Sequence, residues 1–321
     1  MAAHGCAEPL DGTRKHPEMY PVMLTPFTLE GEVDYAALEA LIAFYEENGV
    51  DGLFAVCQSS EVFYLSLAER VHIASFVKRH AHVPVVASGH ISYALSDQEE
   101  ELRRIADTGV DAVILITNRL AGQQDGPDIW RRNLERLLQV LDPAMPLGFY
   151  ECPMPYKRLI SDGELAFAAS TGRFRFMKDT CCDIEIIRRR LQILRGSSMG
   201  LYNANTATLL ASLQAGAAGY SGIMANFHPE LYAWLLKNYE QAPEKAQTVQ
   251  ALLTACAHIE KQLYPVNAKY HLSALKGLPM TTVSRAQDHH GLSPLFQDEV
   301  RQMDRLIRHF EESGWLDTAK E

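Results

Sequence analysis

The stretch NGVDGLF at residues 48–54 returns in modified form as TGVDAVI at residues 108–114. In both stretches a glycine ends a segment with helical spacing, and a short apolar run follows. Glycine is common just after the last turn of a helix, and short continuous apolar runs are typical of strands buried on both faces. The repeated junction therefore predicts helix-to-strand units that follow one another along the chain.

Further apolar runs alternate with amphipathic segments on both sides of these junctions. The predicted strands cover residues 20–24, 52–56, 84–88, 112–116, 146–151, 174–178, 191–195 and 218–222. The predicted helices between them cover residues 35–48, 66–80, 96–108, 127–141 and 205–214. This alternation favours a parallel α/β fold, and no G-x-G-x-x-G follows a strand as in an open dinucleotide-binding sheet. Because ~250 residues is the usual size of a (β/α)8 TIM barrel, we predict that fold.

The C-terminal part of the chain has a different pattern. From about residue 229 onward the periodicity is helical only. No segment rich in Gly, Pro or Ser separates this part from the preceding one, so we expect a helical extension packed on the barrel. The predicted organisation is a loose leader (residues 1–18), a (β/α)8 barrel (residues 19–240) and a C-terminal helical extension (residues 241–321).

Composition and charge argue against several classes of protein. The 321 residues carry a formal net charge of −10 and no basic patch, so a nucleic-acid partner is not expected. The six cysteines form no C-x-x-C pair, which favours reduced thiols over a disulfide framework. No apolar run approaches the ~20 residues that span a bilayer, and residues 1–18 lack the apolar segment of a secretory signal. We therefore expect a cytoplasmic protein without a membrane partner.

Two histidine clusters were natural candidates for metal ligands. They are His80-Ala81-His82 and His289-His290. Neither has partner ligands at a spacing that is typical of metal sites. Both are interpreted as surface histidines, and no metal site is predicted.

Lys178 is the most prominent residue at a predicted strand end. Active sites of (β/α)8 barrels lie at the carboxyl ends of the strands, and Lys178 directly follows the apolar run FRFM at residues 174–177. Burial at that point disfavours the ammonium form and lowers the pKa of a lysine. A neutral amine can attack a ketone and form an imine. The alternative is a lysine that neutralises the adjacent Asp179, and position alone does not separate the two.

Two other strand ends carry polar side chains. Tyr150 ends the fifth predicted strand and could transfer a proton across the barrel mouth. Gln58, Ser59 and Ser60 follow the second predicted strand, where successive N–H groups and hydroxyls could hold a carboxylate. Taken alone, a core tyrosine and an ordinary turn explain these residues better.

An ordered set of motifs connects these strand ends. The set consists of LTPF (residues 24–27), GVDGL (49–53), SSE (59–61), LSLAER (65–70), YECP (150–153), KDT (178–180), GAAG (216–219) and AN (225–226). In this order it resembles the dihydrodipicolinate synthase / N-acetylneuraminate lyase family of class I aldolase-like enzymes over about residues 20–230. One such motif has little specificity, whereas the ordered set at successive strand ends is a specific signal.

The resemblance implies a role for individual residues. Lys178 would be the Schiff-base lysine and Tyr150 the general acid/base. Ser59 and Ser60 would bind the carboxylate of a pyruvate-like substrate, and a backbone carbonyl near Ser221 would face the lysine or the substrate. The resemblance implies no metal and no organic cofactor. It also implies a small-molecule 2-oxo acid as substrate and a homotetramer built as a dimer of dimers.

The chain departs from the family at several positions. Gln58 stands where the synthases have a hydroxyl residue, residues 117–120 (TNRL) stand where the family often has T-P-Y-Y, and Pro155 stands at the place of a substrate-binding arginine. These changes disfavour a lysine-pathway synthase. After the seventh predicted strand, Ser198 and Met199 stand where the sialic acid lyases have acidic residues, which disfavours sialic acid as the substrate.

The shared core chemistry is imine formation with a 2-oxo acid. The candidate contacts to the distal part of the substrate are Glu151, His90, Arg119 and Lys157. The predicted reaction is that of a lyase or aldolase. The alternatives are a dehydratase that acts on a 2-oxo-3-deoxy sugar acid through the same imine, a dihydrodipicolinate synthase-like condensation, and a non-catalytic sugar-acid binding protein.

Overall fold

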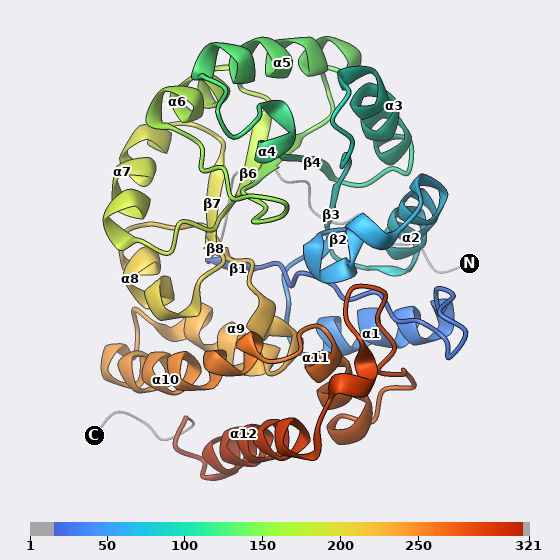
Figure 1. Cartoon of the computed structure of the whole chain (residues 1–321). Helices are drawn as coiled ribbons and strands as arrows, with labels where there is room; N and C mark the ends of the chain where they lie inside the picture. Colours follow the sequence, from blue (N-terminus) through green and yellow to red (C-terminus); the bar gives the residue numbers. More distant parts are fainter. Residues whose placement is uncertain (1–15, 317–321) are drawn as a thin grey trace, which may run out of the picture.

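The computed structural model describes residues 16–316 and contains eight strands with helices around them (Figure 1). The strands are β1 (Glu18–Met19), β2 (Leu53–Ala55), β3 (Val85–Ser88), β4 (Ala112–Ile116), β5 (Leu147–Tyr150), β6 (Phe174–Asp179), β7 (Gly200–Asn203) and β8 (Gly219–Tyr220). Nearly all of their residues are buried, because one face of each strand points into the barrel and the other contacts the helices. The apolar runs in the sequence are the result of this double burial.

The strands form a closed, parallel ring. Their order in the sheet is β1-β8-β7-β6-β5-β4-β3-β2. A parallel bridge between Val22 and Phe54 joins the two ends of the sheet, and the N–H of Met23 donates to the carbonyl oxygen of Phe54 at 2.9 Å. The predicted (β/α)8 TIM barrel is therefore confirmed.

The helices cover the outside of this ring (Figure 1). Those of the barrel are α1 (Tyr35–Glu47), α2 (Leu67–His80), α3 (Leu95–Ala106), α4 (Thr117–Leu120), α5 (Pro127–Val140), α6 (Asp162–Ser170), α7 (Ile184–Leu194), α8 (Leu209–Gln214) and α9 (Pro229–Asn238). The short helix α4 directly follows β4 at the barrel mouth. The five predicted helices are confirmed with shifts at their ends, and Ser66 and Glu69 form the capping box that starts α2.

Two predicted strands were misplaced. The first strand is Glu18–Met19, so it begins inside the segment predicted to be a leader, and residues 20–24 contribute only the bridge at Val22. The strand predicted at residues 191–195 was wrong, because Leu191–Leu194 belong to α7. Asp183 caps that helix by accepting hydrogen bonds from the N–H groups of Glu185 and Ile186, and a short apolar run alone does not distinguish helix from strand.

The seventh strand, β7, lies further along the chain than predicted. Ser198 and Met199 precede β7, so they do not occupy the place compared with the acidic residues of sialic acid lyases. The segment that follows β7 is Ala204-Asn205-Thr206-Ala207. It contains no carboxylate either, so the departure holds with different residues.

The C-terminal extension packs against the barrel near its mouth. Its helices are α10 (Pro243–Cys256), α11 (Val266–Tyr270) and α12 (Pro294–Glu312). Lys269 of α11 donates to Glu61 of the barrel at 2.6 Å, and both side chains are buried. We propose that the boundary between the barrel and the C-terminal extension lies between residues 240 and 241. Residues 1–15 of the predicted leader lie outside the described residues. No helix within residues 16–316 has the length and hydropathy to cross a bilayer.

Candidate functional site

A pocket of about 450 Å³ lies at the carboxyl ends of the barrel strands. Its polar lining residues are Gln58, Ser59, Glu61, Tyr64, Arg119, Tyr150, Lys157, Lys178, Thr180, Asn205, Glu260, Tyr264 and Gln287. A second pocket of about 660 Å³ lies beside Gly200 and Ala218, at the amino ends of β7 and β8. Because (β/α)8 enzymes place their chemistry at the carboxyl ends, the first pocket is the candidate site.

Lys178 reaches this pocket from β6. Its side chain is 4% exposed, and Nζ lies 4.5 Å from the centre of the Tyr150 ring and 5.8 Å from that of Phe54. Burial lowers the pKa of Lys178 to about 8. Within residues 16–316 its ammonium group has neither a hydrogen bond nor an ion pair, and Asp179 pairs with Arg190 instead. The alternative that Lys178 neutralises Asp179 is therefore wrong.

Tyr150 lies beside the lysine because the two residues are register partners on β5 and β6. Residues in register on neighbouring strands share a face of the sheet, and this face points into the barrel. The Tyr150 hydroxyl donates to Oε1 of Gln58 at 3.3 Å, and the thiol of Cys152 donates to the same oxygen at 3.5 Å. Burial raises the pKa of Tyr150 well above its usual value, so the hydroxyl keeps its proton.

The two serines of the turn after β2 have different surroundings. Ser59 lines the pocket and hydrogen bonds to Tyr264. Ser60 does not line it: its hydroxyl donates to the carbonyl oxygen of Met23 at 2.6 Å, and its N–H donates to that of Cys57 at 3.0 Å. The 3-10 turn Gln58–Ser60 directs Ser60 back toward the barrel wall. Ser60 therefore shapes the turn and has no free donor for a carboxylate, contrary to prediction.

Ser221 lies behind the pocket. It is fully buried, its N–H donates to Asn203 at 2.9 Å, and its hydroxyl has no partner within residues 16–316. The next residues along the chain, Gly222 and Ile223, line the pocket. The backbone at Ser221 therefore adjoins the site, and its contact with a substrate stays a prediction.

Unusual backbone conformations gather around this site. In the described part of the chain, residues 16–316, three residues other than glycine have positive φ: Val56 (52°), Glu61 (61°) and Cys182 (60°). Glu61 and Cys182 line the pocket, and Val56 directly follows β2. Such conformations cost roughly 1–3 kcal/mol each and persist where surrounding contacts impose them, often at functional sites.

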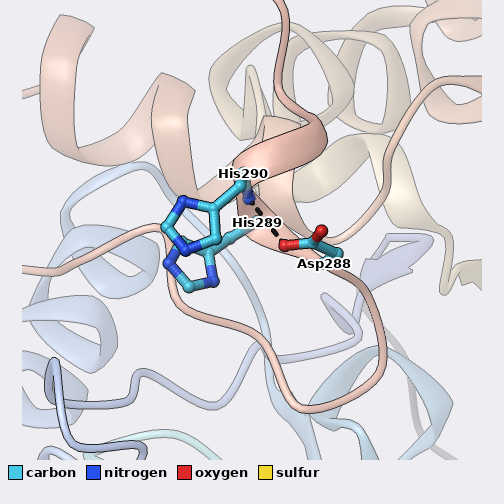
Figure 2. A group of neighbouring side chains, drawn as sticks. All are labelled: Asp288, His289 and His290. Carbon is cyan, nitrogen blue, oxygen red and sulfur yellow. Dashed lines mark hydrogen bonds between the residues drawn. The ribbon is translucent and has the colours of Figure 1, made fainter.

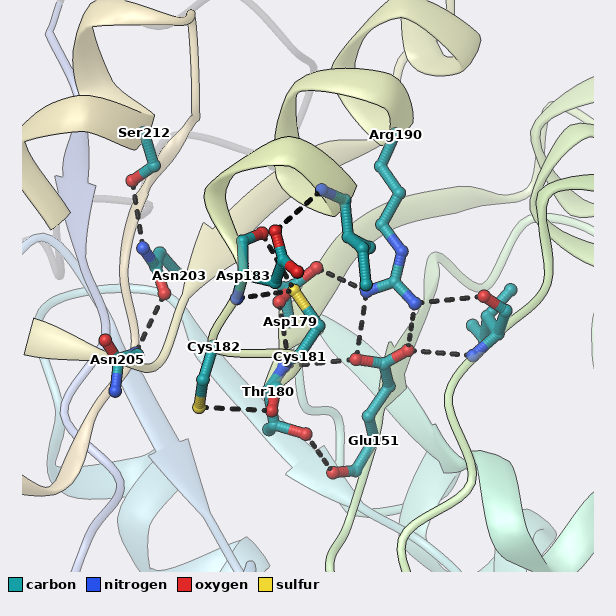
Figure 3. A network of polar contacts seen from close by, with 12 residues as sticks. Glu151, Asp179, Thr180, Cys181, Cys182, Asp183, Arg190, Asn203, Asn205 and Ser212 are labelled. Carbon is teal, nitrogen blue, oxygen red and sulfur yellow. Dashed lines mark hydrogen bonds and ion pairs between the residues drawn. The ribbon is translucent and has the colours of Figure 1, made fainter. Parts of the chain in front are cut away.

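A buried ionic network fixes the ends of β5 and β6 (Figure 3). Arg190 of α7 donates to Glu151 at 2.6 Å, to Asp179 at short range and to the carbonyl oxygen of Ile160 at 2.9 Å. Glu151 also accepts from the N–H of Thr180 at 3.1 Å. The carboxylates and the guanidinium are at most 1% exposed. Glu151 therefore positions the strand ends and is not a distal substrate contact, contrary to prediction.

His90 is likewise a structural residue. It is fully buried; Nε2 accepts from the N–H of Ile116 at 2.7 Å, and Nδ1 lies 2.8 Å from Oε1 of Gln98. Burial lowers the pKa of His90 to about 4, so the ring is neutral. Of the four predicted distal contacts, Arg119 and Lys157 line the pocket and His90 does not.

The C-terminal extension supplies pocket residues that sequence reasoning missed. Glu260 lies in the 3-10 turn Ala257–Lys261, and Tyr264 follows it; both line the pocket. Burial raises the pKa of Glu260, while the charge of Lys178 lowers it. The Tyr264 hydroxyl accepts from Nδ2 of Asn226 at 3.1 Å. No local pattern marks these residues, because they lie in a segment whose spacing indicates only helix packing.

One group of possible metal ligands lies outside this site (Figure 2). The potential ligand atoms of Asp288, His289 and His290 lie within 4.8 Å of one another. The three residues are consecutive, and Asp288 accepts a hydrogen bond from the N–H of His290 at 3.0 Å as the cap of a 3-10 turn. Capping explains this arrangement without an ion.

Comparison with known proteins agrees with the motifs. The model of the dihydrodipicolinate synthetase family matches residues 16–120. An uncharacterised DapA-like lyase of Chloroflexus aurantiacus is 27% identical over 87% of this chain and 91% of its own. The 4-hydroxy-tetrahydrodipicolinate synthase of Bacillus subtilis is 25% identical over 89% and 96%, and the N-acetylneuraminate lyase of Escherichia coli is 25% identical over 73% and 77%.

Solved structures share the fold at lower identity. A dihydrodipicolinate synthase of Bacillus anthracis superposes with a TM-score of 0.81 at 18% identity, over 91% of this chain and 99% of its own. A sialic acid aldolase of Ruminococcus gnavus superposes with a TM-score of 0.82 at 17% identity, over 93% and 98%. Motifs, barrel and relatives agree: the chain is similar to the dihydrodipicolinate synthase / N-acetylneuraminate lyase family of lyases and aldolases, from whose listed relatives it diverges to 25–27% identity.

Proposed function

We propose that this protein is a class I lyase that forms a Schiff base between Lys178 and a pyruvate-type 2-oxo acid. The observation that carries the proposal is the state of Lys178, an amine without an ionic partner within residues 16–316 whose pKa burial lowers to about 8. A lysine with this pKa has a useful neutral fraction near pH 7, and the neutral amine is the nucleophile. The solved prophage protein YagE of Escherichia coli, a 22% identical relative in fold, is described in complex with pyruvate.

The proposed reaction consists of imine formation, cleavage of a C–C bond and hydrolysis. Nζ of Lys178 adds to C2 of the 2-oxo acid, and the adduct loses water to give an iminium. In a substrate with a hydroxyl group on C4, cleavage of the C3–C4 bond moves its electron pair toward the iminium nitrogen and leaves an enamine. The C4 hydroxyl loses its proton, and the fragment that contains C4 departs as an aldehyde. Protonation at C3 and hydrolysis release pyruvate and the free lysine.

Tyr150 is the proposed proton carrier in these steps. Its ring lies 4.5 Å from Nζ of Lys178, and its hydroxyl is held by Gln58 at 3.3 Å. A phenol with a raised pKa is a proton donor in the free enzyme, and the positive iminium favours its ionised form once the imine exists. Ser59, with its backbone N–H, is the proposed ligand of the substrate carboxylate, whereas Ser60 supports the turn.

Reductive trapping tests the proposal. Incubation with pyruvate and borohydride should add the mass of a reduced pyruvate imine to the intact protein, and Lys178→Ala should abolish the adduct. Lys157→Ala, which removes another pocket lysine, should retain the adduct. Absence of an adduct with pyruvate and with a panel of 2-oxo acids would falsify the Schiff-base lyase and leave the non-catalytic binding protein.

Product analysis separates the remaining alternatives. Lyase activity on 2-oxo-3-deoxy sugar acids releases pyruvate and an aldehyde, whereas a dehydratase releases water and keeps the carbon chain intact. A synthase-like condensation runs in the opposite direction and consumes pyruvate and an aldehyde.

Two further parts of the proposal are a dimer of dimers, measurable by light scattering after gel filtration, and a cytoplasmic location, measurable by fractionation.

A further inference from the structure

Arg119 is a buried cation that has no anionic partner within residues 16–316. It lies on α4, directly after β4, and is 7% exposed, and its side chain lines the pocket that contains Lys178. Within residues 16–316 its guanidinium makes no hydrogen bond and no ion pair, and Nε and Nη1 are buried without a partner. Burying a charged group without a partner is costly, so the unpaired guanidinium favours a site that binds an anion.

Aromatic rings hold the guanidinium in place without neutralising it. Its central carbon lies 4.3 Å from the centre of the Tyr93 ring and 5.4 Å from that of Phe63. Contacts of this kind with aromatic faces are favourable, but they leave the donors of the guanidinium unused. The rings therefore orient a fork of N–H groups that is still able to bind an anion.

The backbone beneath Arg119 is also fixed. Gln98 donates to the carbonyl oxygens of Arg119 at 3.0 Å and of Tyr93 at 3.2 Å, and His90 lies 2.8 Å from the same glutamine. His90 in turn accepts from Ile116 at 2.7 Å. These buried contacts hold both Arg119 and the aromatic residue that covers it. Such preorganisation reduces the cost of binding a ligand.

From this environment we infer that Arg119 binds a second carboxylate of the substrate, at the end distant from the imine carbon. The proposal rests on the proposed function and adds the substrate class: 2-oxo acids that carry two carboxylates. A guanidinium pairs with a carboxylate through two parallel hydrogen bonds. Glu260 lines the same pocket and repels negative charge, so a singly charged carboxylate fits better than a doubly charged phosphate.

Pairs of 2-oxo acids with equal chain length provide the test. 2-Oxoglutarate is compared with 2-oxopentanoate, and 2-oxoadipate with 2-oxohexanoate, by the concentration that gives half-maximal trapping with borohydride. In the wild type, the half-maximal concentration of the diacid should be lower than that of its monoacid by a factor of about ten or more in at least one pair. The reason is that the analogue without the second carboxylate leaves a buried donor unpaired. Pyruvate serves as the common reference.

Three variants identify the source of the preference. Arg119→Met should remove it, bringing the ratio within a pair to about one, with pyruvate trapping retained. Arg119→Lys should keep part of the preference, because it retains the charge and loses the planar fork. Arg104→Met is the matched control, since Arg104 is on α3 with 44% of its side chain exposed, and it should leave the ratio unchanged.

The outcomes separate the two proposals. Wild-type protein that traps pyruvate without preferring either diacid overturns the role of Arg119 and leaves the Schiff-base proposal intact. A preference that survives in Arg119→Met overturns it as well. Failure of the wild type to trap any 2-oxo acid overturns the proposed function and this inference with it. If Arg119→Met does not fold, the ratio in Arg119→Lys decides, and an unchanged ratio there contradicts the two-bond contact.

Discussion

Lys178 and Tyr150 face each other as register partners on β6 and β5, with Nζ 4.5 Å from the centre of the phenol ring. This contact places the amine against an apolar ring face rather than a carboxylate. The lysine therefore has a pKa lowered to about 8, and the tyrosine has one raised well above its usual value. At neutral pH the pair contains a potential nucleophile beside a potential proton donor.

Imine formation should become faster with rising pH and level off above about pH 8. The reason is that the neutral fraction of Lys178 increases up to its lowered pKa of about 8. The initial rate of pyruvate trapping, measured between about pH 6 and pH 10 with a short borohydride pulse, gives the profile. A midpoint near the ordinary value for lysine, 10.5, would contradict the burial effect.

Glu260→Gln should move the midpoint of that profile to lower pH. The negative charge of Glu260 raises the pKa of Lys178, and the amide removes this effect while keeping the shape. Glu100→Gln is the control, because Glu100 is on α3 with 67% of its side chain exposed, and its profile should match the wild type. A midpoint that stays in place or rises in Glu260→Gln contradicts the coupling.

Lys178→Met should stabilise the fold at neutral pH. The pKa of Lys178 falls from 10.5 in the unfolded chain to about 8 in the fold, so the folded ammonium form costs ~3 kcal/mol at most, at 1.36 kcal/mol per pKa unit. This cost is fully present below about pH 8 and disappears as the pH rises through 10.5. Urea unfolding at pH 7 and at pH 10 measures the difference between variant and wild type. Equal gains at both pH values would point to packing rather than charge.

Tyr150→Phe should slow proton transfer while leaving imine formation possible. Removal of a general acid/base typically costs ~10²–10⁴ in rate. The measurement is the exchange of pyruvate methyl protons for deuterium, followed by NMR, which reports on the enamine without knowledge of the natural substrate. Gln58→Leu should slow exchange by a smaller factor, because it removes the acceptor at 3.3 Å and leaves the phenol. Tyr239→Phe, outside the pocket lining, serves as control.

Unchanged exchange in Tyr150→Phe would assign the proton transfer to another group. Tyr264 would then be the next residue to test, since its hydroxyl belongs to the same pocket.

Arg190→Met should be strongly destabilising. It leaves Glu151 and Asp179 buried without their shared cation, which typically costs ~3–5 kcal/mol. The loss should shrink as the pH falls, because unpaired buried carboxylates have raised pKa values and become neutral on protonation. Denaturant unfolding at pH 7 and pH 5 measures both effects. Arg189→Met is the control: it is 52% exposed on the same helix, and its loss should stay within ~1 kcal/mol.

The sequence was sufficient to predict the barrel and to place Lys178 and Tyr150 at its mouth. Each residue lies at the end of a short apolar run that is typical of a strand in a (β/α)8 barrel, but it was the ordered set of family motifs, rather than position alone, that favoured a role in catalysis. The strand at residues 191–195 was wrong for a physical reason. Short apolar segments have the same composition in a buried strand and on the inner face of α7, and only the Asp183 cap distinguishes them.

The roles of neighbouring residues were harder to predict because of the alternation of side chains along a strand. Tyr150 and Lys178 point into the barrel, so Glu151 and Asp179, one residue further, point toward the helix layer and meet Arg190. His90 was misassigned because its partner, Gln98, is supplied by α3. Glu260 contacts the site only through the packing of distant segments, which no local pattern encodes.

The ion pair between Lys269 and Glu61 joins the C-terminal extension to the barrel, so the pocket of this protein is built from two parts of the chain that can vary separately. The barrel alone holds Lys178 and Tyr150, whereas the extension contributes Glu260 and Tyr264 to the pocket wall. Mutation in the segment 257–264 should therefore change the shape of the pocket wall while Lys178 and Tyr150 keep their positions on β6 and β5, although a change at Glu260 also shifts the pKa of Lys178. For directed evolution, a mutant library confined to residues 257–264, with the barrel sequence unchanged, is therefore the natural choice.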